Sequence, residues 1–192
     1  MRNSFLLALI AVALWPSVAF AHPSDAAHVH SLTAGLLHPL TGFDHLLAMV
    51  AVGAWGASLG RANAWLVPSA FVTGMAIGIF GGGALAGAAW IETAIAASLI
   101  GLGLFLALTV QLPRGLAMAL CGLAGLVHGA AHASEGPTQT AFFAFAVGAL
   151  AMTAALHGAG VSLGLLATRL PALVVRMAGA AIALVGACYL AV

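Results

Sequence analysis

Residues 38–49 read HPLTGFDHLLAM, which places two histidines and one aspartate in a run that is otherwise apolar enough for a membrane helix. A charged side chain at the centre of a membrane helix costs roughly 2.5–3.5 kcal/mol on insertion scales. Three ionisable groups within eight residues therefore require an interaction that offsets this free-energy cost. A bound metal cation is the simplest one, because imidazole and carboxylate groups are common metal ligands.

The composition of the chain indicates a membrane protein. Its 192 residues are 64% hydrophobic and 5% charged, and the mean hydropathy is +1.17. Soluble domains carry about 25% charged residues, so the composition argues against a soluble globular protein. The chain has no lysine and no basic patch, which argues against a nucleic-acid partner.

Residues 1–21 are predicted to be a cleaved signal peptide. Arg2 supplies the charged start, an apolar run follows, and Ala19-Phe20-Ala21 has the form of an A-x-A cleavage site. The alternative is an uncleaved first transmembrane helix. Residues 22–31 then form a histidine-rich tail, which we expect in the periplasm. Its histidines are either accessory metal ligands or part of a solvated leader with no role; they are His22, His28 and His30.

Residues 32–192 are predicted to form an all-α bundle of six transmembrane helices. Each apolar segment is close to the ~20 residues that a helix needs to cross a bilayer. The predicted spans are residues 32–59, 64–80, 88–110, 116–132, 138–166 and 170–192. The chain is thus expected to be an integral membrane protein with one domain after the tail.

The arginines indicate how these helices are oriented. Those beyond the signal peptide lie in alternate connections, and the other connections contain neither Arg nor Lys. They are Arg61, Arg114, Arg169 and Arg176. The positive-inside rule places them in the cytoplasm and both ends of the mature chain outside. We therefore expect a multi-pass protein of a bacterial inner membrane with a periplasmic N-terminus.

Glycines recur at four-residue spacing in several of these segments. The sets are Gly74/Gly78/Gly82, Gly83/Gly87, Gly125/Gly129 and Gly160/Gly164. Such faces let membrane helices approach closely. The alternative is that this spacing arises by chance, because glycine is frequent in this chain.

In the first predicted span, His38 and His45 are seven residues apart, and two turns of helix return them to nearly the same face. Asp44 points elsewhere on a straight helix. Pro39 and Gly42 favour a kink or an unwound turn between the two histidines. Such a break can turn Asp44 toward the same site, as in the broken helices of transporters. Alternatively, Asp44 fixes an imidazole by accepting its N–H.

The fourth predicted span ends in a second polar cluster. His128, His132 and Glu135 are spaced i, i+4 and i+7, so they share one helical face. The predicted topology places both clusters in the outer half of the membrane, where they can face each other. The predicted metal ligands are His38, Asp44, His45, His128, His132 and Glu135. The alternative is a buried polar network that only holds helices together.

Three further residues are candidates for accessory roles. Glu92 begins the third predicted span on the outer side, where it would join the mouth of the path or steer cations. Phe71 is either an aromatic wall of that path or an ordinary packing residue. His157 lies nearer the cytoplasm and is either an exit ligand or a histidine bonded to a backbone carbonyl.

The two clusters contain motifs that resemble the HupE/UreJ family of nickel and cobalt permeases. The motifs are HPLTGFDHLLAMVAVG at residues 38–53 and HGAAHASEG at residues 128–136, and the length and predicted spans also fit. The resemblance implies secondary uptake of Ni²⁺ or Co²⁺, associated with hydrogenase or urease maturation, and does not separate the two metals. It implies functional roles for His38, Asp44, His45, Phe71, Glu92, His132 and Glu135.

The sequence therefore predicts a permease rather than an enzyme, with Ni²⁺ or Co²⁺ as its substrate and no permanently bound cofactor. Nitrogen-rich ligands suit these metals, whereas Mg²⁺ and Ca²⁺ prefer oxygen ligands. The chain contains no GxxxxGK[ST] motif for ATP binding, which favours secondary transport.

Two alternatives from other functional classes remain open. One is a ceramidase-like intramembrane zinc hydrolase, in which the histidines hold zinc and Asp44 and Ser134 take part in the chemistry. The other is a haem protein with one axial histidine from each cluster. The sequence also leaves open whether the chain forms a homo-oligomer.

Overall fold

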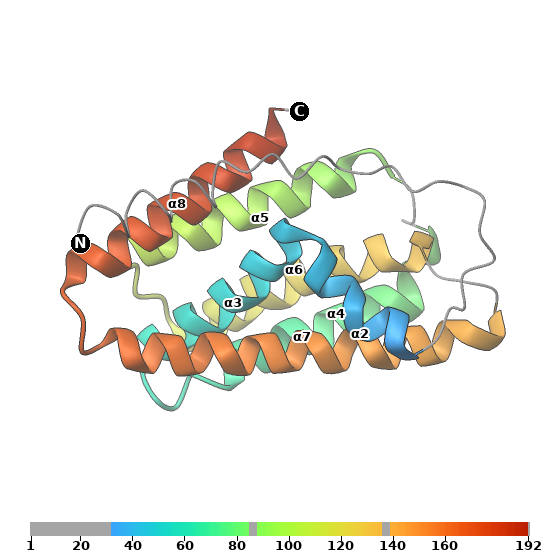
Figure 1. The fold of residues 1–192 in the computed structure, drawn as a ribbon, viewed down its shortest axis with the longest axis horizontal. Helices are drawn as coiled ribbons and strands as arrows, with labels where there is room; N and C mark the ends of the chain where they lie inside the picture. The colour runs from blue at the N-terminus through green and yellow to red at the C-terminus, as the bar shows by residue number, and fades with distance from the viewer. Residues whose placement is uncertain (1–31, 85–87, 136–138, 192) are drawn as a thin grey trace.

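A computed structural model describes residues 32–84, 88–135 and 139–191 of the protein. The predicted signal peptide and the histidine-rich tail lie outside the described residues. Helices account for most of the described residues (Figure 1). They are α2 (Leu32–Thr41), α3 (Phe43–Ser58), α4 (Leu66–Gly81), a 3₁₀-helix (Gly82–Ala84), α5 (Trp90–Ala107), α6 (Arg114–Glu135), α7 (Gln139–Ala167) and α8 (Ala172–Leu190).

The helices in the described part of the chain are those of a multi-pass membrane protein. By length and composition, α5, α6, α7 and α8 can each cross a bilayer, and α2 with α3 makes a fifth span if the bent pair counts as one. α4 has 16 residues. At 1.5 Å per residue α4 is about 24 Å long, less than the ~30 Å hydrocarbon core. The all-helical prediction is confirmed, whereas the described helices give four to five candidate spans where six were predicted.

The first predicted span, residues 32–59, is two helices rather than one. α2 and α3 meet at Gly42 and are bent by 85°. Gly42 has an extended backbone with φ −88° and ψ 110°, and Pro39 lacks the N–H that would continue the helical ladder. The Thr41 hydroxyl donates a 2.8 Å hydrogen bond to the His38 carbonyl, which satisfies one acceptor at the end of α2. The predicted kink is confirmed.

The helices pack largely in pairs, with α4 against α6, α5 against α8, and both α2 and α3 against α7. Figure 1 shows α5 and α8 side by side along one edge of the bundle, α7 along the opposite edge, and α3 between them. α3 is therefore central, and half of its side chains are buried. α3 begins directly after Gly42, so its N-terminal end, with Asp44 and His45, lies at the break between the two helices.

Glycine lets the backbones of α4 and α6 approach each other directly. A Cβ on Gly74 or Gly78 would overlap backbone atoms of α6, and one on Gly125 or Gly129 would overlap carbonyls of α4. Both faces were predicted from four-residue spacing. Since lipid tails are as apolar as the side chains, this close packing supplies much of the force that holds the two helices together.

The other predicted glycine faces differ in their packing. Gly160 and Gly164 of α7 lie against the backbone of α3, so this face is confirmed. At Gly83 an added Cβ meets open space, and Gly87 lies outside the described residues. The prediction of a packing face is therefore wrong at Gly83.

Candidate metal site

Four histidines from three helices meet inside the bundle. His38 of α2 lies 4.6 Å from His132 of α6, measured between ring centroids. His45 of α3 lies 5.3 Å from His132 and 5.3 Å from His128 of α6. These four residues are called the histidine cluster below. The prediction that the polar groups of the first and fourth segments face each other is met for these four side chains.

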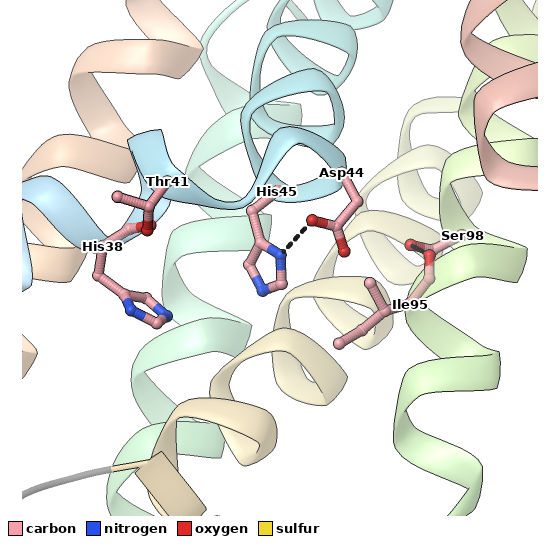
Figure 2. A network of polar contacts seen from close by, with 6 residues as sticks. All are labelled: His38, Thr41, Asp44, His45, Ile95 and Ser98. Atoms are coloured by element: carbon pink, nitrogen blue, oxygen red, sulfur yellow. Dashed lines mark hydrogen bonds and ion pairs between the residues drawn. The ribbon is translucent and has the colours of Figure 1, made fainter. Parts of the chain in front are cut away.

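The Gly42 break brings the first two histidines together. On a straight helix, seven residues separate two side chains by about 10.5 Å along the axis. Across the break, the ring centroids of His38 and His45 are 6.2 Å apart. Figure 2 shows the two rings projecting from the two sides of the break toward the same region.

The other two histidines are positioned by the glycine face of α6. Gly125 and Gly129 form this face, and His128 and His132 continue it at helical spacing. The close approach to α4 therefore also encloses both imidazoles, and each is 0% exposed.

Exposure falls along the cluster. His38 is half-buried, the His45 side chain is 13% exposed, and His128 and His132 are fully buried. The cluster thus begins at a partly accessible imidazole and ends in the interior of the bundle.

Asp44 lies beside the cluster and orients one of its rings. Its Oδ1 is 3.0 Å from His45 Nδ1, and the pair is marked by the dashed line in Figure 2. A carboxylate paired with an imidazole nitrogen in this way fixes the orientation of the ring. Of the two roles considered for Asp44, this geometry is that of the group that fixes an imidazole.

Replacement of Asp44 with asparagine is expected to weaken metal binding by about 10–100-fold, because the amide no longer selects the Nδ1–H tautomer of His45. Metal titration of the purified protein measures this change. Ser98→Ala is the matched control, because the Ser98 hydroxyl is satisfied by the Ile95 carbonyl at 2.7 Å. Equal affinities for Asp44→Asn and wild type would show that Asp44 does not orient a ligand.

His128 is oriented in the same way by the backbone. Its Nδ1 lies 2.9 Å from the Ala124 carbonyl and donates to it. Its Nε2 is buried and has no hydrogen-bond partner among the described residues. A buried, unpaired ring nitrogen is destabilising unless a ligand uses it. His128 therefore offers Nε2 as a donor atom for a cation.

The cluster is not a closed metal cage. Among the described residues, no three His, Cys, Asp or Glu side chains already surround one metal position. The rings instead meet edge to face, with planes 81° apart for His38 and His132 and 73° apart for His45 and His128. A cation bound here requires the rings to rotate until their nitrogens converge.

The remaining predicted residues are not members of the histidine cluster, and the structure describes only some of them. Glu92 lies in the first turn of α5 with an exposed side chain. Glu135 is the last residue of α6, and its side chain lies outside the described part of the structure. His22, His28 and His30 also lie outside it. Phe71 is fully buried, with its ring 5.2 Å from His128 and 5.0 Å from His157.

Two buried residues, one beside the histidine cluster and one further along α7, were not predicted from the sequence. Phe145 of α7 lies 5.4 Å from His38 and 6.5 Å from His132, and it closes one side of the cluster. An aromatic residue in an apolar helix carries no signal of such a role. Thr153 is 0% exposed and lies four residues before His157, a spacing that could have been recognised.

Comparison with known proteins identifies the family. The model for the family described as HupE / UreJ protein matches residues 6–189. Protein HupE of Rhizobium leguminosarum bv. viciae is 42% identical over 195 residues, which cover 99% of each chain. No solved structure matches the chain. The family consists of metal transporters and accessory proteins rather than enzymes, so the hydrolase alternative is set aside. The chain belongs to the HupE/UreJ family, whose members are associated with nickel and cobalt transport.

Proposed function

We propose that this protein is a secondary permease that takes up Ni²⁺, and also Co²⁺, through the histidine cluster. The observation that carries the proposal is the meeting of four imidazoles from α2, α3 and α6 within one membrane bundle. The metal is the substrate, and no permanently bound cofactor is required. Family membership links such transport to hydrogenase or urease maturation.

The donor set supports a borderline transition metal. Imidazole nitrogen suits Ni²⁺ and Co²⁺, whereas Mg²⁺ and Ca²⁺ require oxygen ligands. The contact of His45 with Asp44, and of His128 with the Ala124 carbonyl, fixes one nitrogen of each ring and supports a role for both imidazoles in the proposed site. Glu135 and the histidines of the tail remain predicted contributors at the outer side.

The fall in exposure along the cluster gives the proposed direction of movement. A hydrated cation meets the half-buried His38 first, exchanges water for imidazole at His45 and His132, and then reaches the buried His128. Because the rings must rotate to converge, the ion is held transiently rather than in a rigid cage. Transient binding favours passage, since tight binding would prevent release.

The proposed topology has six spans and a periplasmic N-terminus, with α4 as a short span and α2–α3 as a broken one. Arg114 at the start of α6 donates a 2.9 Å hydrogen bond to Asn63 in the α3–α4 connection, so these two connections lie at one end of the bundle. The α7–α8 connection lies at the same end (Figure 1). Arg61 and Arg169 lie in these connections, Arg114 begins α6, and Arg176 lies within α8 near its start rather than in the connection where the sequence placed it. The positive-inside rule assigns this end to the cytoplasmic side.

Cells that express the protein are expected to accumulate radiolabelled Ni²⁺ above vector-only cells, and excess unlabelled Co²⁺ but not Mg²⁺ should suppress the accumulation. The selectivity follows from the nitrogen donors of the cluster. His38→Ala, which removes the first imidazole of the proposed path, should bring accumulation close to the vector level. Wild-type accumulation no greater than that of His38→Ala, at equal protein levels in the membrane, would overturn the proposal.

A further inference from the structure

A second buried polar pair lies on α7, away from the histidine cluster. Thr153 and His157 are 0% and 1% exposed. They are four residues apart and therefore share one face of the helix. Thr153 Oγ1 and both ring nitrogens of His157 have no hydrogen bond of standard geometry among the described residues. The Met49 backbone lies close enough to bond one ring nitrogen of His157, as in the backbone-bonded role considered for this residue. The Thr153 hydroxyl and the other ring nitrogen are enclosed without a partner among the described residues.

Local hydrogen bonding does not account for Thr153. Several hydroxyl groups elsewhere in the described helices bond to a carbonyl of the preceding turn, as Ser162 does to Gly158 at 2.9 Å and Thr73 does to Ser69 at 2.8 Å. A helical threonine therefore has a ready intrahelical partner, which Thr153 does not use. Ionisable or polar groups that remain unpaired within a membrane helix bundle mark a path or a site.

The pair lies on the inner side of Phe71. The Phe71 ring is 5.2 Å from His128 of the cluster and 5.0 Å from His157. Along α7, His157 follows Phe145, which contacts His38, by twelve residues. At 1.5 Å per residue, this places His157 about 18 Å further along the helix, toward the arginine-bearing end. One buried aromatic ring thus separates the histidine cluster from His157.

The donor atoms of the pair define the ligand that it can take. His157 offers an imidazole nitrogen, Thr153 offers a hydroxyl oxygen, and the Met49 carbonyl lies beside the His157 ring. This neutral set of one nitrogen and two oxygens suits a borderline divalent cation that keeps some of its water. This donor set binds a cation more weakly than four imidazoles do. Weak binding on the inner side allows the ion to leave.

We propose that Thr153 and His157 form a second, weaker station for a divalent transition-metal ion, separated from the histidine cluster by Phe71. The proposal rests on the permease function and deepens it: the ion pauses at the cluster, passes Phe71, and pauses again at His157 before release.

Thr153→Val is the sharpest variant, because it exchanges a hydroxyl for a methyl group of nearly the same volume. If Thr153 helps to bind the ion, the maximal rate of Ni²⁺ uptake by Thr153→Val should fall about tenfold. The concentration for half-maximal uptake should be unchanged. A purely structural Thr153 predicts the opposite, since loss of an unpaired buried hydroxyl leaves uptake intact and leaves thermal stability equal or higher. Ser162→Ala on the same helix is the control and should retain wild-type uptake.

His157→Gln tests the site without reference to transport. Titration of the purified full chain with Co²⁺, followed by its visible absorption, should show one weakly bound ion fewer in His157→Gln than in wild type. Binding of Co²⁺ at the histidine cluster should be the same in the two proteins. Equal weak binding in the two proteins, or wild-type uptake by Thr153→Val, would overturn the station. If His157→Gln does not accumulate in the membrane, Thr153→Val decides.

The two proposals fail in different ways. Absence of Ni²⁺ uptake by wild type refutes the permease, whatever Co²⁺ titration shows at His157. Uptake by wild type that Thr153→Val leaves unchanged refutes the second station and leaves the permease standing.

Discussion

Replacement of His132 with alanine is expected to reduce metal uptake to the level of cells without the protein. His132 is fully buried and is the ring of the cluster that lies near both His38, at 4.6 Å, and His45, at 5.3 Å. Its loss therefore removes a buried imidazole that contacts both of these rings, and it leaves His38 with the more distant His45 ring at 6.2 Å. Since even a group that only orients a ligand contributes about 10–100-fold to metal affinity, we expect a fall of more than about 100-fold in initial uptake rate.

The control for His132→Ala is Val127→Ala on the same helix. Val127 is 9% exposed and packs with Ile91, away from the imidazoles. Truncation there also leaves a cavity in the packing of α6, smaller than that of His132→Ala, and removes no donor atom. Uptake should stay within about twofold of wild type, at a cost of about 1–2 kcal/mol in stability. Loss of uptake in both variants alike would mean that packing of α6, and not the imidazole, controls transport. Full uptake by His132→Ala would show that transport does not require the histidine cluster.

Gly125→Ala is expected to reduce the amount of folded protein in the membrane severely. A Cβ on Gly125 would overlap the Phe71 carbonyl, so α4 and α6 must separate. Overpacking of this kind typically costs about 1–3 kcal/mol, and backbone gives way less readily than a side chain, which places this site at the upper end. The shift also moves His128 and Phe71, so the residual folded protein should transport poorly.

The matched control is Gly101→Ala. Gly101 lies inside α5, and an added Cβ there meets open space. Alanine is the better helix former by about 1 kcal/mol in water, so folding should be unchanged or improved. Fluorescence-detected size-exclusion chromatography and thermal melting in detergent compare the two variants. Equal melting temperatures for Gly125→Ala and Gly101→Ala would show that α4 and α6 are not held by direct backbone contact.

Much of the site could be predicted because its residues stand out chemically. Histidines in an apolar chain are conspicuous, and the spacing of His128 and His132 places them on one face without any tertiary information. The kink followed from Pro39 and Gly42. Spacing alone could not decide whether Asp44 turns into the site or holds His45, because that depends on the angle between two helices.

What escaped prediction depended on contacts between distant segments. Phe145 joins the cluster because α2 packs on α7, and no local pattern reveals that pairing. Gly83 has the same four-residue spacing as the packed glycines and meets nothing. Residue spacing describes a single helix, whereas these contacts depend on how two helices pack together.

The break at Gly42 also has an electrostatic consequence. Each helix end carries a partial charge of about half an elementary charge, negative at the C-terminus and positive at the N-terminus. α2 therefore ends with a negative pole beside His38, and α3 begins with a positive pole inside the bundle. Asp44 lies in the first turn of α3 and offsets that positive pole. Because the helices diverge by 85°, their dipoles do not align head to tail, and the field left at the break favours a cation.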